Sequence, residues 1–267
     1  MEAFHQLSGW PCDNVAAAAI APDGTAHTWG DTSRRFPLAS ITKLFTAAAV
    51  LLAVEEGSVE RTTVVDDRGA TVADLLAHSS GIAPNGKLLD DPGRRRIYSN
   101  AGYEQLARIV EHATEIPFAT YLDEGIFQPF AMTSTSLRAS PAFGAESTVD
   151  DLVLFMKLIG ELLAPATMTA MTSPHLPELI GVLPGYGRQS PNLWGLGPEI
   201  RGAKSPHWTG TTNSPGTWGH FGHTGTFLWF DPEVTVCCVV LTDRAFDDWA
   251  KPLWPTFSDH VRAELSA

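Results

Sequence analysis

A serine and a lysine three residues apart stand at the predicted start of a helix. The segment Ser40-Ile41-Thr42-Lys43 opens a stretch rich in Ala and Leu that ends at Gly57, a residue type that often closes helices. Residues three apart share one face of a helix, so the lysine amine is expected beside the serine hydroxyl. A lysine buried in an apolar helix can lose its proton near neutral pH and activate the serine as a nucleophile. The free N–H groups at the helix start suit the oxyanion that such an attack creates.

A tyrosine and an asparagine two residues apart form a second motif. Tyr98-Ser99-Asn100 lies where a loop enters a helix predicted over residues 101–114. A tyrosine there can relay protons between the serine, the lysine and a leaving group, and Asn100 can bind a substrate carbonyl or hold the lysine in place. Ser-x-x-Lys alone is a weak signal, but the two motifs in this order predict a serine hydrolase that forms an acyl-enzyme on Ser40.

These motifs, with a later His-x-Gly, resemble those of the penicillin-recognising serine hydrolases. The closest branch resembles class C β-lactamases, the DD-peptidases that use His-Thr-Gly, and their esterase relatives. The resemblance extends over residues 36–244 and implies no metal or organic cofactor. Three further segments agree with it: Leu-Leu-Ala-His-Ser-Ser-Gly-Ile at 75–82, Ser-Thr-Val-Asp-Asp-Leu at 147–152 and Trp-Gly-Leu-Gly at 194–197, the last resembling a strand of the family.

Two overlapping positions compete for the third motif. His-Thr-Gly at 223–225 spells the family motif, but it leaves only 226–230 to finish one strand, turn and form the next. That is tight, because hairpin loops alone usually take about two to five residues. His-Phe-Gly at 220–222 leaves 223–230 for the turn and the return strand, with Thr-Gly as the natural turn. The spacing therefore favours the first histidine.

The favoured register assigns specific roles. His220 and Gly222 lie on the strand that lines the cleft, and the backbone N–H of His223 completes the oxyanion hole with that of Ser40. In the alternative register His223 is the motif residue and Thr226 supplies that N–H. The phenylalanine after His220 replaces a family threonine that helps to bind a substrate carboxylate. This departure weakens penicillins and D-alanyl peptides as substrates.

Strand patterns occur at both ends of the chain, with helical patterns between them. A Pro-Asp-Gly turn at 22–24 between two short apolar runs predicts a β-hairpin. The Ala- and Leu-rich helix is apolar nearly all round and should be buried on every side. The stretch 174–215 is dense in Pro and Gly and should form loops that wall the site. Helices are predicted over 40–56, 71–76, 101–114, 148–163 (opened by Ser147, with Asp150 three residues later) and 249–265, and strands over 15–20, 25–29, 216–223, 227–230 and 234–241.

This order of elements predicts an α/β (α+β) fold of two lobes. Residues 1–60 and 207–267 would form an antiparallel sheet flanked by helices, and residues 61–206 an all-helical second lobe, as in the β-lactamase and transpeptidase fold. The site would lie in the cleft between the lobes, where pockets usually form. Together the lobes make one catalytic unit with Ser40 at their junction.

Composition narrows the possible partners. The chain is 44% hydrophobic and 18% charged, which argues against disorder, and its net charge of -12 opposes binding to nucleic acid or an anionic membrane surface. Residues 1–9 lack a secretion signal, and the apolar stretch 44–54 is too short to cross a bilayer.

The sequence also argues against a metal site. The three cysteines have no metal-ligand spacing: Cys12, Cys237 and Cys238. His220 and His223 are three positions apart in a predicted strand, so their side chains would face opposite ways. A reduced, cytoplasmic, metal-free protein is therefore expected.

Several other residues have plain structural explanations. His78 is expected to be bonded to loop carbonyls, and Arg94-Arg95-Arg96 to be a solvated loop run, the alternative for the latter being attraction of an anionic substrate. Four tryptophans could wall an acyl pocket or fill the core: Trp194, Trp208, Trp218 and Trp229.

The sequence predicts the class of substrate less directly than it predicts the reaction. Penicillin targets and β-lactamases usually work outside the cytoplasm, so an esterase or amidase acting on small molecules is the first expectation. β-Lactamase or DD-peptidase activity on a lactam or peptide is the second. A catalytically idle binding protein on the same fold is the third, and the joint presence of Ser40, Lys43 and Tyr98 argues against it.

Overall fold

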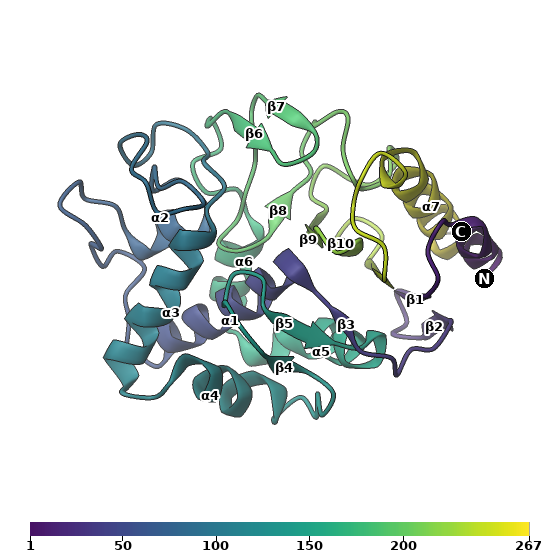
Figure 1. Ribbon diagram of the computed structural model, residues 1–267, viewed down its shortest axis with the longest axis horizontal. Coiled ribbons are helices and arrows are strands. Elements are labelled where there is room, and N and C mark those ends of the chain that lie inside the picture. Colours follow the sequence, from purple (N-terminus) through teal and green to yellow (C-terminus); the bar gives the residue numbers. More distant parts are fainter. Residues whose placement is uncertain (267) are drawn as a thin grey trace.

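The computed structural model describes residues 1–266, which form a six-stranded antiparallel sheet with helices on both faces (Figure 1). The strand order is β2-β1-β11-β10-β9-β8, so both ends of the chain build one sheet. The expected α/β fold is confirmed. The helices are η1 (Glu2–Gly9), η2 (Ala39–Ile41), α1 (Thr42–Glu55), α2 (Val72–Leu76), α3 (Asn100–Thr114), α4 (Phe118–Leu122), η3 (Asp123–Phe127), α5 (Val149–Leu162), α6 (Pro165–Thr172) and α7 (Ala250–Leu265). The strands are β1 (Val15–Ile20), β2 (Ala26–Trp29), β3 (Phe36–Pro37), β4 (Ser136–Leu137), β5 (Ala145–Ser147), β6 (Gly181–Leu183), β7 (Gly187–Gln189), β8 (Glu199–Ile200), β9 (Trp218–Gly222), β10 (Thr226–Asp231) and β11 (Val236–Thr242).

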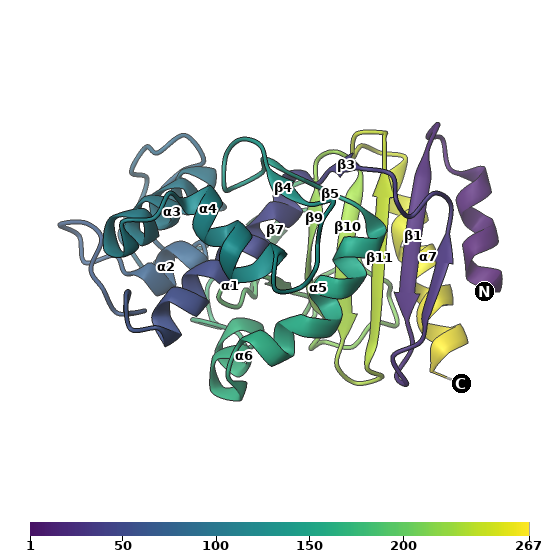
Figure 2. The ribbon, with the colours of Figure 1, turned by 90° about the horizontal axis from the view of Figure 1, so that it is seen from below.

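Strand β11 is apolar throughout because both of its faces are covered. Cys237, Val239 and Leu241 pack into one core with α1 and α5, whereas Cys238 and Val240 pack into a second core with α7. This alternation follows from the period of two in a strand. Figure 2 shows α5 and α7 on opposite sides of the sheet. The two adjacent cysteines are thus small buried residues, and neither forms a disulfide.

The predicted hairpin and the predicted central helix are both confirmed. Strands β1 and β2 pair around the Pro-Asp-Gly turn, and β1 also pairs with β11. Helix α1 is buried along nearly its whole length, which explains its apolar composition on every side. Its start differs from the prediction, because Ser40 lies in η2, a single 3₁₀ turn that leads into α1.

Several boundaries also differ from the sequence prediction. Thr148, and not Ser147, caps α5, because its hydroxyl accepts the N–H of Asp151. Ser147 instead ends strand β5, where its hydroxyl bonds that of Thr135. The predicted loop 174–215 contains the hairpin β6–β7 and the edge strand β8. Helices α4 and α6 and the π-helical turn η3 were not predicted.

The two ends of the chain lie together. Helix η1 packs against α7, and the Glu264 carboxylate accepts the N–H groups of Glu2 and Ala3 at 3.0 and 2.9 Å (Figure 1). Helices α1 to α4 gather on the other side of the molecule (Figure 2). The division into 1–60 with 207–267 and 61–206 stays a proposal; strand β8 joins the sheet from within the middle segment. No helix in residues 1–266 is long and apolar enough to cross a membrane.

Candidate active site

Lys43 projects from the first turn of α1 into a closed polar environment. Its side chain is fully buried, and Nζ donates to Asn100 Oδ1 at 2.8 Å and to the Ala142 carbonyl at 2.7 Å. The same nitrogen lies 3.4 Å from Ser40 Oγ. Burial lowers the pKa of Lys43 well below its usual 10.5, against a smaller raising effect of Glu104. Burial therefore favours the neutral amine, the form that can act as a base.

Tyr98 approaches the serine from the segment that precedes α3. Its hydroxyl donates to Ser40 Oγ at 2.7 Å, and its ring centre lies 4.7 Å from Lys43 Nζ. Burial raises the pKa of Tyr98, the hydrogen bond with Ser40 lowers it in part, and the Glu199 charge raises it further. The net increase keeps the phenol protonated at neutral pH. Ser40, Lys43 and Tyr98 are thus brought together within hydrogen-bonding reach.

Asn100 is the first residue of α3, and its placement depends on its neighbour. Ser99 caps the helix by accepting the N–H of Gly102 at 3.0 Å. The backbone N–H of Ser99 also bonds His78 Nδ1 at 3.1 Å. These contacts aim the Asn100 side chain at Lys43. Of the two roles expected for Asn100, the structure therefore contains the contact that holds the lysine.

His220 and Gly222 belong to β9, and His223 lies in the turn that follows. The turn spans 223–225 and closes with the N–H of Gly225 on the Gly222 carbonyl at 3.0 Å, which is the hairpin that the favoured register requires. The β9 strand contacts η2, and a Cβ at Gly222 would collide with the carbonyl oxygen of Leu38. Only glycine lets this strand end approach so closely.

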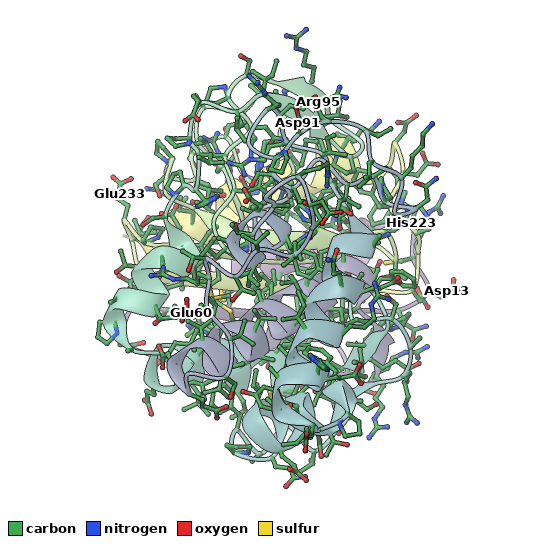
Figure 3. All side chains as sticks on the ribbon, turned by 90° about the vertical axis from the view of Figure 1, so that its left-hand side faces the viewer. Asp13, Glu60, Asp91, Arg95, His223 and Glu233 are labelled. Carbon is green, nitrogen blue, oxygen red and sulfur yellow. The ribbon has the colours of Figure 1, made fainter. Side chains whose placement is uncertain are left out.

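The two histidines have very different surroundings. His220 is 3% exposed, and its ring centre lies 5.9 Å from that of Tyr98. Its Nδ1 contacts the Phe221 carbonyl at 2.8 Å. Burial and then the charge of Lys43 lower the pKa of His220 to about 3, so the ring is neutral. The His223 side chain is exposed at the surface (Figure 3). The catalytic role of either histidine stays a prediction.

A cavity of about 430 Å³ opens onto these groups. This volume falls in the range of small-molecule sites. Among the four tryptophans, Trp194 lines the cavity, while the other three are buried outside its lining. The lining residues are Ser40, Tyr98, Asn100, Leu183, Pro184, Gly185, Trp194, Glu199, His220, Phe221, His223, Phe246, Asp247 and Lys251.

Arg96 is a structural residue that the sequence prediction placed wrongly in a solvated run. It is 3% exposed, and its guanidinium donates to the carbonyls of Ala77 (2.7 Å), Asn192 (3.1 Å) and Leu176 (2.8 Å), and to that of His175. It thereby fixes the segment before Tyr98 to the loops after α2 and α6. Its neighbours Arg94 and Arg95 are exposed as expected (Arg95 is labelled in Figure 3). Arg95 pairs with Asp90 at 2.8 Å.

The hydrogen bonding of His78 also differs from the prediction. Its Nδ1 accepts a backbone N–H, that of Ser99, where bonds to loop carbonyls were expected. Its ring packs between those of Tyr98 and Trp194, with centres 4.5 and 4.7 Å away. His78 is nonetheless structural, because it supports the tyrosine from behind.

A buried carboxylate in the cavity wall has no counterpart in the sequence prediction. Glu199 Oε1 accepts Lys204 Nζ at 2.6 Å and His207 Nε2 at 2.9 Å, and its Oε2 accepts Trp208 Nε1 at 2.5 Å. Burial raises the pKa of Glu199, but the Lys204 and His207 contacts outweigh that effect and lower it overall. The available signal was a Glu and the one Lys of this Pro- and Gly-rich stretch, five positions apart. Within residues 1–266, no cluster of three or more His, Cys, Asp or Glu side chains could hold a metal ion.

Comparison with known families identifies the group to which this site belongs. The sequence model of the beta-lactamase family matches residues 14–257, and thus every residue of the two motifs and of β9. The chain belongs to the beta-lactamase family. This assignment confirms the resemblance seen in the sequence, and it makes the chain a member of a family of serine hydrolases.

Individual known proteins are similar to this chain over very different lengths. A crystal structure of a beta-lactamase from Mycobacterium bovis has 48% identity and a TM-score of 0.97, covering 99% of this chain and 100% of that one. Simvastatin synthase (LovD) from Aspergillus terreus shares the fold, with 19% identity, a TM-score of 0.80 and coverage of 100% and 98%. Penicillin-binding protein 4* of Bacillus subtilis (strain 168) is 31% identical over 147 residues, which are 41% of this chain and 33% of that protein. This chain therefore spans about a third of the length of that curated relative.

Proposed function

We propose that this protein is a serine hydrolase that cleaves small esters or amides through an acyl-enzyme on Ser40. The observation that carries the proposal is the bonding of Lys43. A neutral amine has two N–H groups and one lone pair. Asn100 and Ala142 take the two N–H groups at 2.8 and 2.7 Å, so the lone pair is left for the hydroxyl of Ser40, 3.4 Å away.

The reaction follows from this arrangement. Lys43 takes the proton of Ser40 as Oγ attacks the carbonyl carbon, and the backbone N–H groups of Ser40 and His223 bind the oxyanion. Each such donor typically contributes about 3 kcal/mol to catalysis. Tyr98 gives its proton to the leaving group as the bond from that group to the carbonyl carbon breaks, and the Tyr98 oxygen then takes up the proton that Lys43 received from Ser40. Water then attacks the acyl-enzyme carbonyl while Lys43, neutral again, accepts its proton. Lys43 returns this proton to Ser40 Oγ as the acyl–oxygen bond breaks and the acid is released.

The chemistry of β9 supports an ester or amide over a carboxylate-bearing lactam. In the favoured register Phe221 offers no hydroxyl, and His220 is neutral because its pKa is about 3. A carboxylate on a penicillin or a D-alanyl peptide would therefore find neither a hydroxyl nor a positive charge on this strand. The absence of both is the reason to rank esters and amides first.

β-Lactamase activity is the second candidate, favoured by a specific observation. The Mycobacterium bovis protein with 48% identity carries the name beta-lactamase and matches this chain over 99% of its length. Lys251, at the cavity wall, is a cation that could meet a carboxylate away from β9.

Labelling and turnover together test these proposals. A fluorophosphonate probe should modify wild-type protein, and the substitution Ser40→Ala should abolish labelling, whereas Ser58→Ala at an exposed serine should not. Short-chain p-nitrophenyl esters and a chromogenic cephalosporin then serve as competing substrates. Faster turnover of the cephalosporin would put β-lactamase activity first. A folded protein that the probe leaves unlabelled would be the idle binding protein of the third expectation.

A further inference from the structure

The cavity continues past the edge of the sheet into a second, apolar region. Strand β8 pairs with β9 only at Gly219 and Trp218, so beyond Gly219 the edge of β9 that faces away from β10 has no strand beside it. His220 and Phe221 are successive residues of that strand end and project to opposite faces. Both line the same cavity. The cavity therefore reaches round the edge of β9, from the face of the Tyr98 hydroxyl to the face of Phe221.

The region beside Phe221 has an almost wholly apolar lining, which we call the apolar arm. Phe221 is 8% exposed, and its ring centre lies 4.9 Å from that of Phe246. Further aromatic rings, those of Tyr186, Trp208 and Trp254, pack behind Phe221 at 6.1, 5.9 and 6.0 Å and make this wall rigid. The apolar arm is formed by Leu183, Pro184, Gly185, Phe221 and Phe246.

Phe246 closes the arm and is itself tied to the catalytic turn. Its ring packs on Gly185, where an added Cβ would lie 2.6 Å from Cε1 and 3.0 Å from Cζ of Phe246. Gly185 also has a φ of +78°, which side chains disfavour, so both the backbone conformation and the contact with Phe246 require glycine here. The backbone N–H of Phe246 donates to the His223 carbonyl at 2.8 Å. The ring is therefore held between the β6–β7 hairpin and the turn that bears the His223 N–H.

We propose that the apolar arm binds an alkyl or aryl chain of the substrate and that Phe246 sets the length of chain accepted. The inference rests on the proposed function, because the chain belongs to an ester or amide whose carbonyl lies at Ser40. Asp247 and Lys251 at the same cavity give its polar rim. The substrate class is thus an ester or amide with one extended apolar group.

Binding to an inactive variant tests the arm without relying on turnover. In Ser40→Ala protein, the Kd of p-nitrophenyl esters from acetate to decanoate should fall by about fourfold for each added methylene until the arm is full. The chain length at which Kd stops falling is the plateau of this series. Adding Phe246→Ala should move the plateau to longer chains, and adding Phe246→Trp should move it to shorter ones. The matched control is Val182→Ala, which lies on the β6–β7 hairpin beside the arm but is 61% exposed and outside the cavity lining. It should leave the dependence of Kd on chain length unchanged.

Two results would overturn the inference. One is a Kd in the Ser40→Ala protein that does not depend on chain length. The other is a plateau that stays in place in both Phe246 variants while circular dichroism shows them folded. A third outcome separates the two proposals. If Kd depends on chain length but the fluorophosphonate does not label Ser40 of the wild-type protein, the proposed function is contradicted and the apolar arm alone is supported.

Discussion

Replacing Glu199 by glutamine should destabilise the protein strongly, because three buried donors converge on this one carboxylate. Lys204 and His207 bond Oε1 at 2.6 and 2.9 Å, and Trp208 bonds Oε2 at 2.5 Å. Glutamine keeps one acceptor oxygen but places an NH₂ group where the other stood. At least one of these donors then faces another donor in a region closed to water. The Lys204 ammonium also loses its counter-charge.

The magnitude follows from the burial of the pair. The side chains of Lys204 and Glu199 are 1% and 2% exposed, so solvent does not screen their interaction. Removing one partner of such a pair costs about 3–5 kcal/mol, because the remaining charge stays buried. For 267 residues, an unfolding entropy of about 2.1 cal/mol/K per residue gives about 0.56 kcal/mol/K. The expected fall in Tm is therefore about 5–9 °C.

Thermal unfolding followed by circular dichroism measures this change. The matched control is Asp248→Asn, which breaks the surface pair of Asp248 with Lys251, whose side chains are 87% and 42% exposed. That variant should shift Tm by less than about 1 °C. A fall of less than about 2 °C in the Glu199→Gln variant would refute the reasoning, since it would mean that the buried donors find other acceptors.

The effect should also depend on pH in a defined direction. The pKa of Glu199 is lower in the folded protein than its ordinary value of 4.5. As pH falls, the unfolded chain binds a proton at this position first, so the stabilisation is complete above about pH 4.5 and decreases below it. The difference in Tm between wild type and Glu199→Gln should therefore narrow as the pH is lowered below that value.

Three further predictions concern catalysis. Tyr98→Phe removes the hydroxyl that bonds Ser40 Oγ at 2.7 Å and should lower kcat for esters by about 10²–10⁴-fold; a loss below tenfold would exclude the proton transfer. The activity should rise with pH as Lys43 loses its proton, and the midpoint should lie well below the usual 10.5 because burial lowers the pKa of Lys43. The activity should not fall again near pH 10, because burial raises the pKa of Tyr98. A profile of kcat/KM from pH 5 to 10 measures both. His220→Ala should reduce kcat/KM more than His223→Ala, and the reverse order would select the other register.

The sequence predicted the contacts that arise from local geometry. Ser40 and Lys43 lie together because they are three positions apart, across the turn η2 and the start of α1. The burial of α1 follows from its apolar composition. The approach of Tyr98 to Ser40, 58 positions away, was inferred from the order of motifs in related enzymes. Periodicity cannot supply such a contact, because it carries no information on how distant segments pack.

The features that were missed depend on distant partners or on very short elements. Arg96 is surrounded in sequence by charged and loop-forming residues, and only its bonds to carbonyls up to 96 positions away show that it is buried. Strand β8 has two residues, too few for an alternating pattern. The shift of the α5 cap from Ser147 to Thr148 arises because Ser147 pairs with Phe36 in a sheet. Local propensity alone favours serine slightly over threonine as a helix N-cap, which is opposite to what the structure shows.

The lowered pKa of the Lys43 amine depends on how several distant segments of the fold pack together. Lys43 meets Asn100 from α3 and Ala142 from the loop before β5, so its environment exists only while three distant segments are packed together. Its lowered pKa comes chiefly from burial, and any opening that admits water would let the amine take up a proton again. Residues that only support this packing, such as Arg96, therefore affect the chemistry without touching the substrate. In the proposed mechanism, the reactivity of Ser40 therefore depends on the closed packing of α1 against the segments that cover it.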